Sequence, residues 1–215
     1  MAKASIWQDD YWLPLMQVYL KKPVGLKPVY GKDMVALSLE LHIAPTVLAA
    51  RMQQIAKLDT PRLERIWKTY GENPQKLARA VRLWRDMRGF GAAEEFYDGV
   101  EVSETFERDF RQLDEEPGLT PVALILILDL YYRLIPATMV AGTPEVAEMA
   151  RLLGVKAALV VEVLELYQLC DPYLNRSDIS LSPLLSPCQQ VWQRFEKEDP
   201  LQLESFAGEL KAFYQ

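Results

Sequence analysis

Histidine and cysteine, the residues that most often hold metals or act as nucleophiles, are almost missing from this chain. It has one histidine, His42, and two cysteines, Cys170 and Cys188, in 215 residues. Two distant cysteines cannot form a disulfide framework, and neither lies in a Cys/His cluster with metal-site spacing. We therefore predict no bound metal, and we interpret both thiols as reduced and packed as small apolar side chains.

Long hydrophobic segments are missing as well. The longest apolar run, Val122–Leu128, is far shorter than the ~18 residues that a membrane span needs, and Asp129 ends it. The N-terminal stretch MAKASIWQDDYW lacks the apolar core of a signal peptide. The sequence thus predicts a cytoplasmic protein with no membrane partner.

Groups suited to catalysis are equally scarce. Any Ser-His or Cys-His mechanism would need His42, whose place at a turn is explained by its tolerance of left-handed backbone. The stretch Gly89–Gly91 is too short to cradle a phosphate. Acid pairs such as Glu94 and Glu95 lie in acidic surroundings, which is typical of solvated charge. We expect no cofactor and no catalytic residue, and hence a protein that is not an enzyme.

Charge is plentiful but unevenly distributed. The net charge is −6, yet residues 1–91 hold fifteen Lys and Arg against eight Asp and Glu, and residues 92–215 hold nine against twenty-two. An imbalance of +7 against −13 suggests a polyanionic partner for the basic part. The alternative is that both parts only carry solvated faces of opposite sign.

An internal repeat is the main pattern in the chain. Leu37–Asp59 resembles Met149–Asp171, and upstream Leu15–Pro23 resembles Ile127–Pro136 with one residue inserted. After 14 additional residues the similarity resumes, with these matched pairs: Trp67 and Trp192, Tyr70 and Phe195, Pro74 and Pro200, Leu77 and Leu203. We interpret the order of these landmarks as a duplication. Chance similarity of amphipathic helices is the alternative.

Local signals predict helices throughout. Apolar residues recur at three- and four-residue spacing, and no segment shows sustained alternation. Val122–Leu128 alone could be a buried strand, but its counterpart Leu13–Leu20 has helical spacing, so we predict two central helices. A capping residue precedes a first-turn proline at Thr60-Pro61, Asn73-Pro74, Ser186-Pro187 and Asp199-Pro200.

The predicted fold is therefore all-α. It is a tandem duplication of a unit made of one helix, a helix-turn-helix and two further helices, packed as one compact body. We expect a basic first repeat at 1–90, an acidic connecting segment at 91–119 and an acidic second repeat at 120–215. A long surface loop is expected in the second repeat, near DPYLNRSDISLSPLL.

The stretch Glu148–Leu164 resembles the helix-turn-helix superfold. The pattern of that superfold is matched by Met149, Ala150, Gly154, Val155 and Val160, and in the first repeat by Leu37, Ser38, His42, Ile43 and Leu48. In the first repeat Ser replaces Ala and His replaces the turn Gly. The resemblance covers about 22 residues in each repeat, and it implies a DNA-reading second helix.

The side chains available on those second helices do not suit base recognition. Base contacts need Arg, Lys, Asn, Gln, Ser or Thr on the exposed first turns. The second repeat offers Lys156 and Glu162 among apolar residues, and the first offers only Thr46 and Gln53. We predict that the helix of the second repeat is buried core, and that neither helix reads sequence.

A row of cations is the candidate binding site. On a helical wheel Leu77, Ala80, Val81, Trp84 and Met87 share one side of the last helix of the first repeat. Opposite them, and on the preceding helix, lie the candidate residues Arg62, Arg65, Lys68, Lys76, Arg79, Arg82, Arg85 and Arg88. The repeat aligns Lys76, Arg79, Arg82 and Arg85 with Gln202, Ser205, Gly208 and Lys211. Only one of these counterparts is charged, so the fold does not require the charges. Such a row could follow phosphates or an acidic surface. The alternatives are a solvated face and salt bridges to the acidic connecting segment.

These features predict a non-enzymatic regulatory or adaptor protein. Its first repeat would bind nucleic acid or an acidic protein surface, and its second would serve packing or homodimerisation. The alternative is a protein-interaction scaffold that binds no nucleic acid. In size and composition the chain also resembles uncharacterised all-helical cytoplasmic proteins of bacteria, a resemblance that implies no activity.

Overall fold

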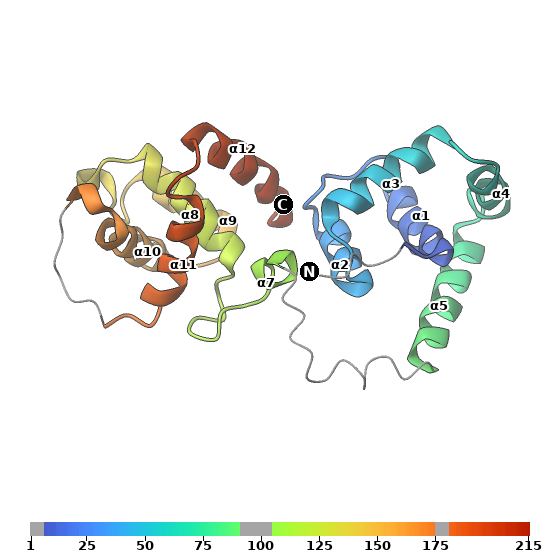
Figure 1. The fold of residues 1–215 in the computed structure, drawn as a ribbon, viewed down its shortest axis with the longest axis horizontal. Helices are drawn as coiled ribbons and strands as arrows, with labels where there is room; N and C mark the ends of the chain where they lie inside the picture. The colour runs from blue at the N-terminus through green and yellow to red at the C-terminus, as the bar shows by residue number, and fades with distance from the viewer. Residues whose placement is uncertain (1–6, 91–104, 175–180) are drawn as a thin grey trace. The chain divides into compact units, whose positions relative to one another are not determined.

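The computed structural model describes residues 7–90, 105–174 and 181–215, and these contain eleven α-helices and no strand. The predicted all-α class is confirmed. The contacts divide the chain into two compact units, Met1–Glu104 and Thr105–Gln215 (Figure 1). Each unit has its own core, and each is described separately below.

The first unit is built around a short central helix, α1 (Trp12–Leu20). It contacts α2 (Lys32–Leu41), α3 (Pro45–Lys57) and α5 (Pro74–Phe90), while α4 (Pro61–Tyr70) contacts α5. Leu15 and Met16 of α1 are almost completely buried, with 0% and 2% of their surface exposed. The apolar faces of the surrounding helices meet on α1, and their burial supplies the main stabilisation of the unit.

The helix ends of the first unit follow the predicted capping residues. The Thr60 hydroxyl accepts a hydrogen bond from the backbone N–H of Leu63 at 3.3 Å, and Asn73 Oδ1 accepts one from Lys76 N–H at 2.9 Å. Each side chain satisfies an N–H group that has no partner within the helix. The two caps fix where α4 and α5, the helices of the candidate site, begin.

The second unit is built around α8 (Pro121–Arg133), in which residues 122 to 131 are all buried. Residues 122 to 128 are at most 1% exposed, which explains why this stretch has no polar face. Around α8 lie α7 (Thr105–Asp109), α9 (Pro144–Leu153), α10 (Ala157–Cys170), α11 (Leu185–Phe195) and α12 (Pro200–Leu210). The helical interpretation of Val122–Leu128 is therefore confirmed.

Two details of the second unit differ from the sequence-based expectation. Ser186 does not cap α11, because the helix starts at Leu185, two residues before Pro187, and has no side-chain cap. The stretch from Thr105 to Leu119, expected to be part of the connecting segment, packs within this unit, where Leu119 is 0% exposed. The earlier part of that segment, 91–104, and part of the expected loop, 175–180, lie outside the described residues.

The two units share an order of helices and several packing contacts. The pairs α1–α2, α1–α3, α1–α5 and α2–α3 correspond to α8–α9, α8–α10, α8–α12 and α9–α10. The fourth helix differs, because α11 packs on both α8 and α10 whereas α4 packs mainly on α5. The shared contacts are compatible with a duplication, which remains a hypothesis.

The described residues also form short 3₁₀ turns. The turns are η1 (Asp9–Tyr11), η2 (Pro136–Thr138), η3 (Pro172–Leu174) and η4 (Lys211–Phe213). Over the described ranges, no single helix has the length and apolar character to cross a membrane; only α2 and α3 taken together, bent by 107°, meet those criteria.

Candidate polyanion-binding faces on α4 and α5

The turn between α2 and α3 shows why the predicted helix-turn-helix pattern occurs in the first unit. His42 has a φ of 56°, in the left-handed region, and ends α2. The Ser38 hydroxyl donates a hydrogen bond to the carbonyl of Ile43, which ties the turn to α2. Gly154 ends α9 in the same region, with a φ of 72°. Both turns therefore satisfy the last carbonyl groups of a helix.

The second helices of these two turns differ in the side chains that they expose. In α10, Val160, Val163 and Leu164 are 0% exposed, as expected for a core helix. Glu162 of α10 accepts a hydrogen bond from the Ser182 hydroxyl at 2.7 Å. In α3, Thr46 and Gln53 are exposed, but Val47 beside Thr46 is apolar. The predicted row of cations lies on other helices, α4 and α5.

The outer face of α4 carries three cations. Leu63 holds the inner face, with 3% of its surface exposed, while Arg62, Arg65 and Lys68 are exposed. Arg62 forms an ion pair with Asp9 at 2.7 Å, and Arg65 Nε donates to the backbone oxygen of Pro61 at 3.3 Å. Lys68 has no ion pair within the described part of the chain. Of the three positive charges, that of Arg62 is therefore already compensated, by Asp9.

The inner face of α5 is formed by Leu77, Val81 and Trp84, which are 1%, 0% and 9% exposed. Trp84 packs edge-on against Tyr11, with ring centroids 6.0 Å apart. The expectation that Met87 joins this face is wrong, since Met87 is 67% exposed. Ala80 is half-buried. The core covers the apolar side of the wheel as far as Trp84 and does not extend to Met87.

The outer face of α5 contains the least compensated cations. Arg79 and Arg82 are exposed, and neither makes an ion pair or hydrogen bond with any described residue. The Lys76 ammonium lies 5.4 Å from the centre of the Tyr70 ring, a cation–π contact that leaves its charge in place. These three side chains are available to an external anion.

Arg85 is the clear exception in this row. Its Nε and Nη2 donate to the two carboxylate oxygens of Glu40 on α2, at 2.7 and 2.9 Å. This hydrogen bonding raises the pKa of Arg85 above its ordinary value. Arg85 therefore fastens α5 to α2 rather than facing a partner. Arg88 lies on α5, but its side chain falls outside the described residues.

The charge of the pair α4 and α5 contrasts with that of the matching pair in the second unit. Residues 61–90 hold eight Lys and Arg against three Asp and Glu, whereas residues 185–210 hold two against five. In α12 the aligned positions are Gln202, Ser205 and Gly208, all exposed. The same local helical order thus occurs with and without the cations, so the cations are not needed to form the helices.

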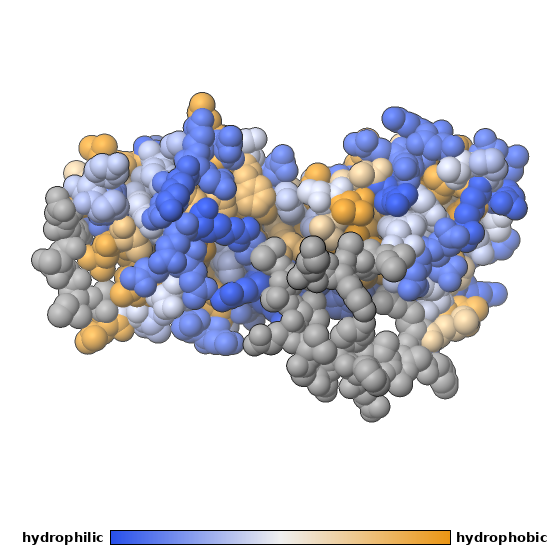
Figure 2. All heavy atoms as spheres, viewed as in Figure 1, coloured by the Kyte–Doolittle hydropathy of each residue, from blue (hydrophilic) through white to orange (hydrophobic). Residues whose placement is uncertain are grey.

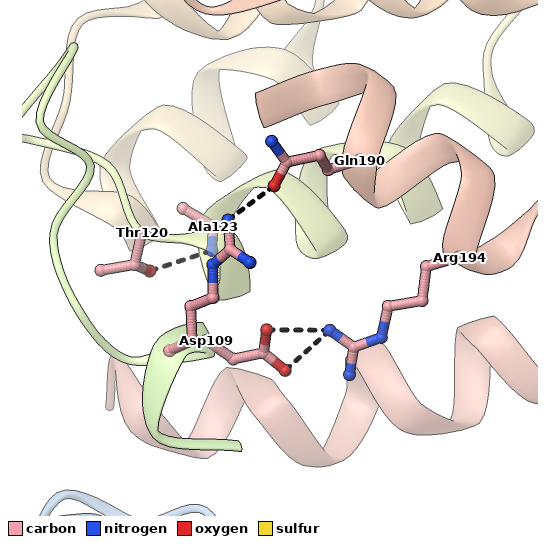
Figure 3. A network of polar contacts seen from close by, with 6 residues as sticks. Asp109, Thr120, Ala123, Gln190 and Arg194 are labelled. Atoms are coloured by element: carbon pink, nitrogen blue, oxygen red, sulfur yellow. Dashed lines mark hydrogen bonds and ion pairs between the residues drawn. The ribbon is translucent and has the colours of Figure 1, made fainter. Parts of the chain in front are cut away.

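A polar pocket in the second unit was not predicted. It has a volume of about 650 Å³ and lies among α7, the start of α8 and α11. Arg194 donates to both oxygens of Asp109 at 2.8 Å, and Gln190 accepts from Arg108 at 2.8 Å (Figure 3). Burial raises the pKa of Asp109, and Arg194 partly offsets this effect.

These contacts give the pocket a structural role. They attach α7 to α11, and the charges around the pocket include both signs: Arg108, Arg111 and Arg194 against Asp109, Asp114 and Glu115. A balanced set of charges favours neither an anion nor a cation. Sequence spacing could not reveal the arrangement, because Asp109 and Arg194 are 85 residues apart.

Groups suited to metal binding or nucleophilic catalysis are few. Among the described residues, no three His, Cys, Asp or Glu side chains form a cluster that could hold a metal. Burial raises the pKa of the Cys170 thiol to about 11 and that of the buried Cys188 thiol further. Both thiols are therefore protonated near neutral pH and are weak nucleophiles.

Comparison with known proteins adds no assignment. No protein-family model, no curated protein and no solved structure matches the chain. The geometry of α4 and α5 is thus the basis for a functional proposal.

Proposed function

We propose that the protein is a non-enzymatic regulatory or adaptor protein whose first unit binds a polyanionic partner, either nucleic acid or an acidic protein surface, through the outer faces of α4 and α5. One observation carries the proposal. Arg79 and Arg82 are exposed, one turn apart on α5, and no described carboxylate pairs with them. An unpaired exposed guanidinium retains its full capacity to bind phosphate or carboxylate groups.

The contribution of the other cations differs from residue to residue. Lys68, Lys76 and Arg65 add charge to the two faces, whereas Arg62 and Arg85 already have the carboxylates of Asp9 and Glu40 as partners. Binding through such a face is expected to be electrostatic, and to weaken steeply as salt concentration rises. Such binding requires no sequence recognition.

A second candidate function is a protein-interaction scaffold that binds no nucleic acid. Leu83 and Met87 favour it, because they are 59% and 67% exposed on the same helix as the free arginines. The protein would then form mixed apolar and charged contacts with another protein. A homodimer formed through the second unit is compatible with either function.

Retention on a heparin column tests the proposal. The wild-type protein should be retained at low salt and should elute as salt increases, and the Arg79→Ala/Arg82→Ala variant should elute at lower salt. The matched control is Arg151→Ala/Lys156→Ala, which removes the same charge from exposed positions of the second unit. Passage of the wild-type protein without retention would count against polyanion binding, as would equal shifts for both variants.

A further inference from the structure

α5 carries a second row of apolar residues in addition to the row that faces the core. Ala80, Leu83 and Met87 follow one another at spacings of three and four residues, and Leu83 and Met87 are 59% and 67% exposed. Spacings of three and four place side chains on one stripe of a helix, as in helices that pack against a partner helix. The described part of the first unit leaves this stripe largely uncovered.

Cations border this apolar stripe. Arg79 lies next to Leu83 on the helical wheel, Arg82 lies further round the same side with Asp86 between them, and Lys76 continues the stripe one turn before Ala80. Asp86 is the only acid of α5. In Figure 2 the surface over α4 and the adjoining part of α5 is mainly hydrophilic, and hydrophobic surface lies toward the C-terminal end of α5. The stripe is thus apolar from Ala80 to Met87, and the charges in line with it and beside it are three cations, Lys76, Arg79 and Arg82, and one acid, Asp86.

We propose that this face of α5 is a docking surface for an acidic amphipathic helix of a partner protein. The partner would place apolar side chains at three- and four-residue spacing against Leu83 and Met87, and Asp or Glu beside Arg79 and Arg82. This inference rests on the proposed function and selects between its two classes of partner. A nucleic acid would use the guanidinium groups but would leave the apolar stripe exposed to solvent.

The two kinds of side chain have separate roles in such a contact. Burial of Leu83 and Met87 supplies affinity, and the flexible Met side chain adapts to different partner surfaces. Arg79 and Arg82 orient the partner helix and speed its association, because charge complementarity mainly sets specificity and on-rate. Arg85 remains paired with Glu40 and keeps α5 in place.

Peptide binding to the full-length protein tests the proposal. The probe is a fluorescent helical peptide of about 18 residues, or five turns, with Leu at three- and four-residue spacing and Glu beside it. A scrambled peptide of the same composition is its control. On the wild-type protein we expect the amphipathic peptide to bind at least ~10-fold more tightly than the scrambled one.

Variants separate the apolar from the charged contribution. Leu83→Gln/Met87→Gln should abolish the preference for the amphipathic peptide without changing heparin elution, since Gln retains a high helix propensity. Arg79→Ala/Arg82→Ala should weaken binding of both peptides. Equal affinity of the wild-type protein for the two peptides, or a preference that survives Leu83→Gln/Met87→Gln, overturns the proposal.

Two further measurements identify other occupants and separate the two proposals. Sedimentation of the protein alone detects self-association. A wild-type dimer that Leu83→Gln/Met87→Gln dissociates would assign the surface to a second copy and overturn the proposal. If the wild-type protein is not retained on heparin, the proposed function is refuted. If it is retained but binds the amphipathic and scrambled peptides equally, only the docking surface is refuted.

Discussion

Tyr131 and Trp192 meet edge to face in the second unit, with ring centroids 5.8 Å apart and ring planes at 78°. In the first unit Tyr19 and Trp67 meet in the same way, at 6.0 Å and 75°. The repeat detected in the sequence aligns Tyr19 with Tyr131 and Trp67 with Trp192. A duplication would explain why both units contain this side-chain contact.

The two tryptophans should differ in their contribution to stability. Trp192 is 7% exposed and contacts Tyr131, Tyr132 and Tyr167, whereas Trp67 is only half-buried. We expect Trp192→Ala to lower the free energy of unfolding by about 3–5 kcal/mol and Trp67→Ala by about 1–3 kcal/mol. Denaturant unfolding followed by circular dichroism measures both. A larger loss for Trp67→Ala would contradict the assigned burial.

The turn glycine of the second unit gives a prediction about backbone conformation. Gly154 has a φ of 72°, and a Cβ there would meet no atom within 4 Å, so Gly154→Ala should cost about 1–2 kcal/mol through backbone strain alone. Gly208 is the matched control, because it lies within α12 and also has open space around a Cβ. Gly208→Ala should raise stability by about 0.5–1 kcal/mol. Thermal melts of the two variants should shift in opposite directions.

The sequence predicted the helices well because the signals that define them are local. Proline after Thr60, Asn73 or Asp199 indicates a helix start whatever the helix later contacts, and each of these side chains accepts a hydrogen bond from its helix. The uninterrupted apolar stretch at 122–128 likewise predicted a buried element. Such features depend on neighbours within four residues.

The candidate site was less predictable because it depends on contacts between distant residues. A helical wheel places Met87 beside Trp84 but cannot show that the core ends before Met87. The wheel also cannot reveal that Glu40 binds Arg85 or that Asp9 binds Arg62, pairs that are 45 and 53 residues apart. Of the row predicted from sequence, the structure leaves Lys68, Lys76, Arg79 and Arg82 as its most available charges.

The buried carboxylate of Asp109 predicts a dependence of stability on pH. Its pKa is raised in the folded protein by burial, so the folded state holds this proton more tightly than the unfolded chain. The wild-type protein therefore loses stability from this group as pH rises from about 3.9, the ordinary aspartate value, through the raised pKa. The Asp109→Asn variant has no carboxyl group at this position, so its stability lacks this dependence on pH.

A comparison of the two proteins isolates this effect. The melting temperature of Asp109→Asn relative to wild type should increase as pH rises through that window and should then stay constant. Melts in steps from pH 3.5 to 7 provide the measurement. If the melting temperature of the wild-type protein instead rises relative to that of Asp109→Asn as pH increases, the ion pair with Arg194 outweighs the effect of burial.

The cysteines should be unreactive in the folded protein. Cys170 is half-buried with a pKa of about 11, and Cys188 is 0% exposed, so little thiolate is present at pH 8. A thiol reagent that forms a coloured product should modify Cys170 slowly and Cys188 more slowly, and both should react rapidly in denaturant. Reaction of either folded-state thiol at the rate of free cysteine would show that it is accessible.

The salt dependence of heparin binding tests the central claim most directly. Binding of a fluorescent heparin oligosaccharide should weaken linearly on a plot of log affinity against log salt. Arg79→Ala/Arg82→Ala should reduce the slope by about 2, one for each lost contact, while Arg151→Ala/Lys156→Ala should leave it unchanged. No measurable binding at ~50 mM salt, or one slope shared by all three proteins, would contradict a polyanion-binding role for α5.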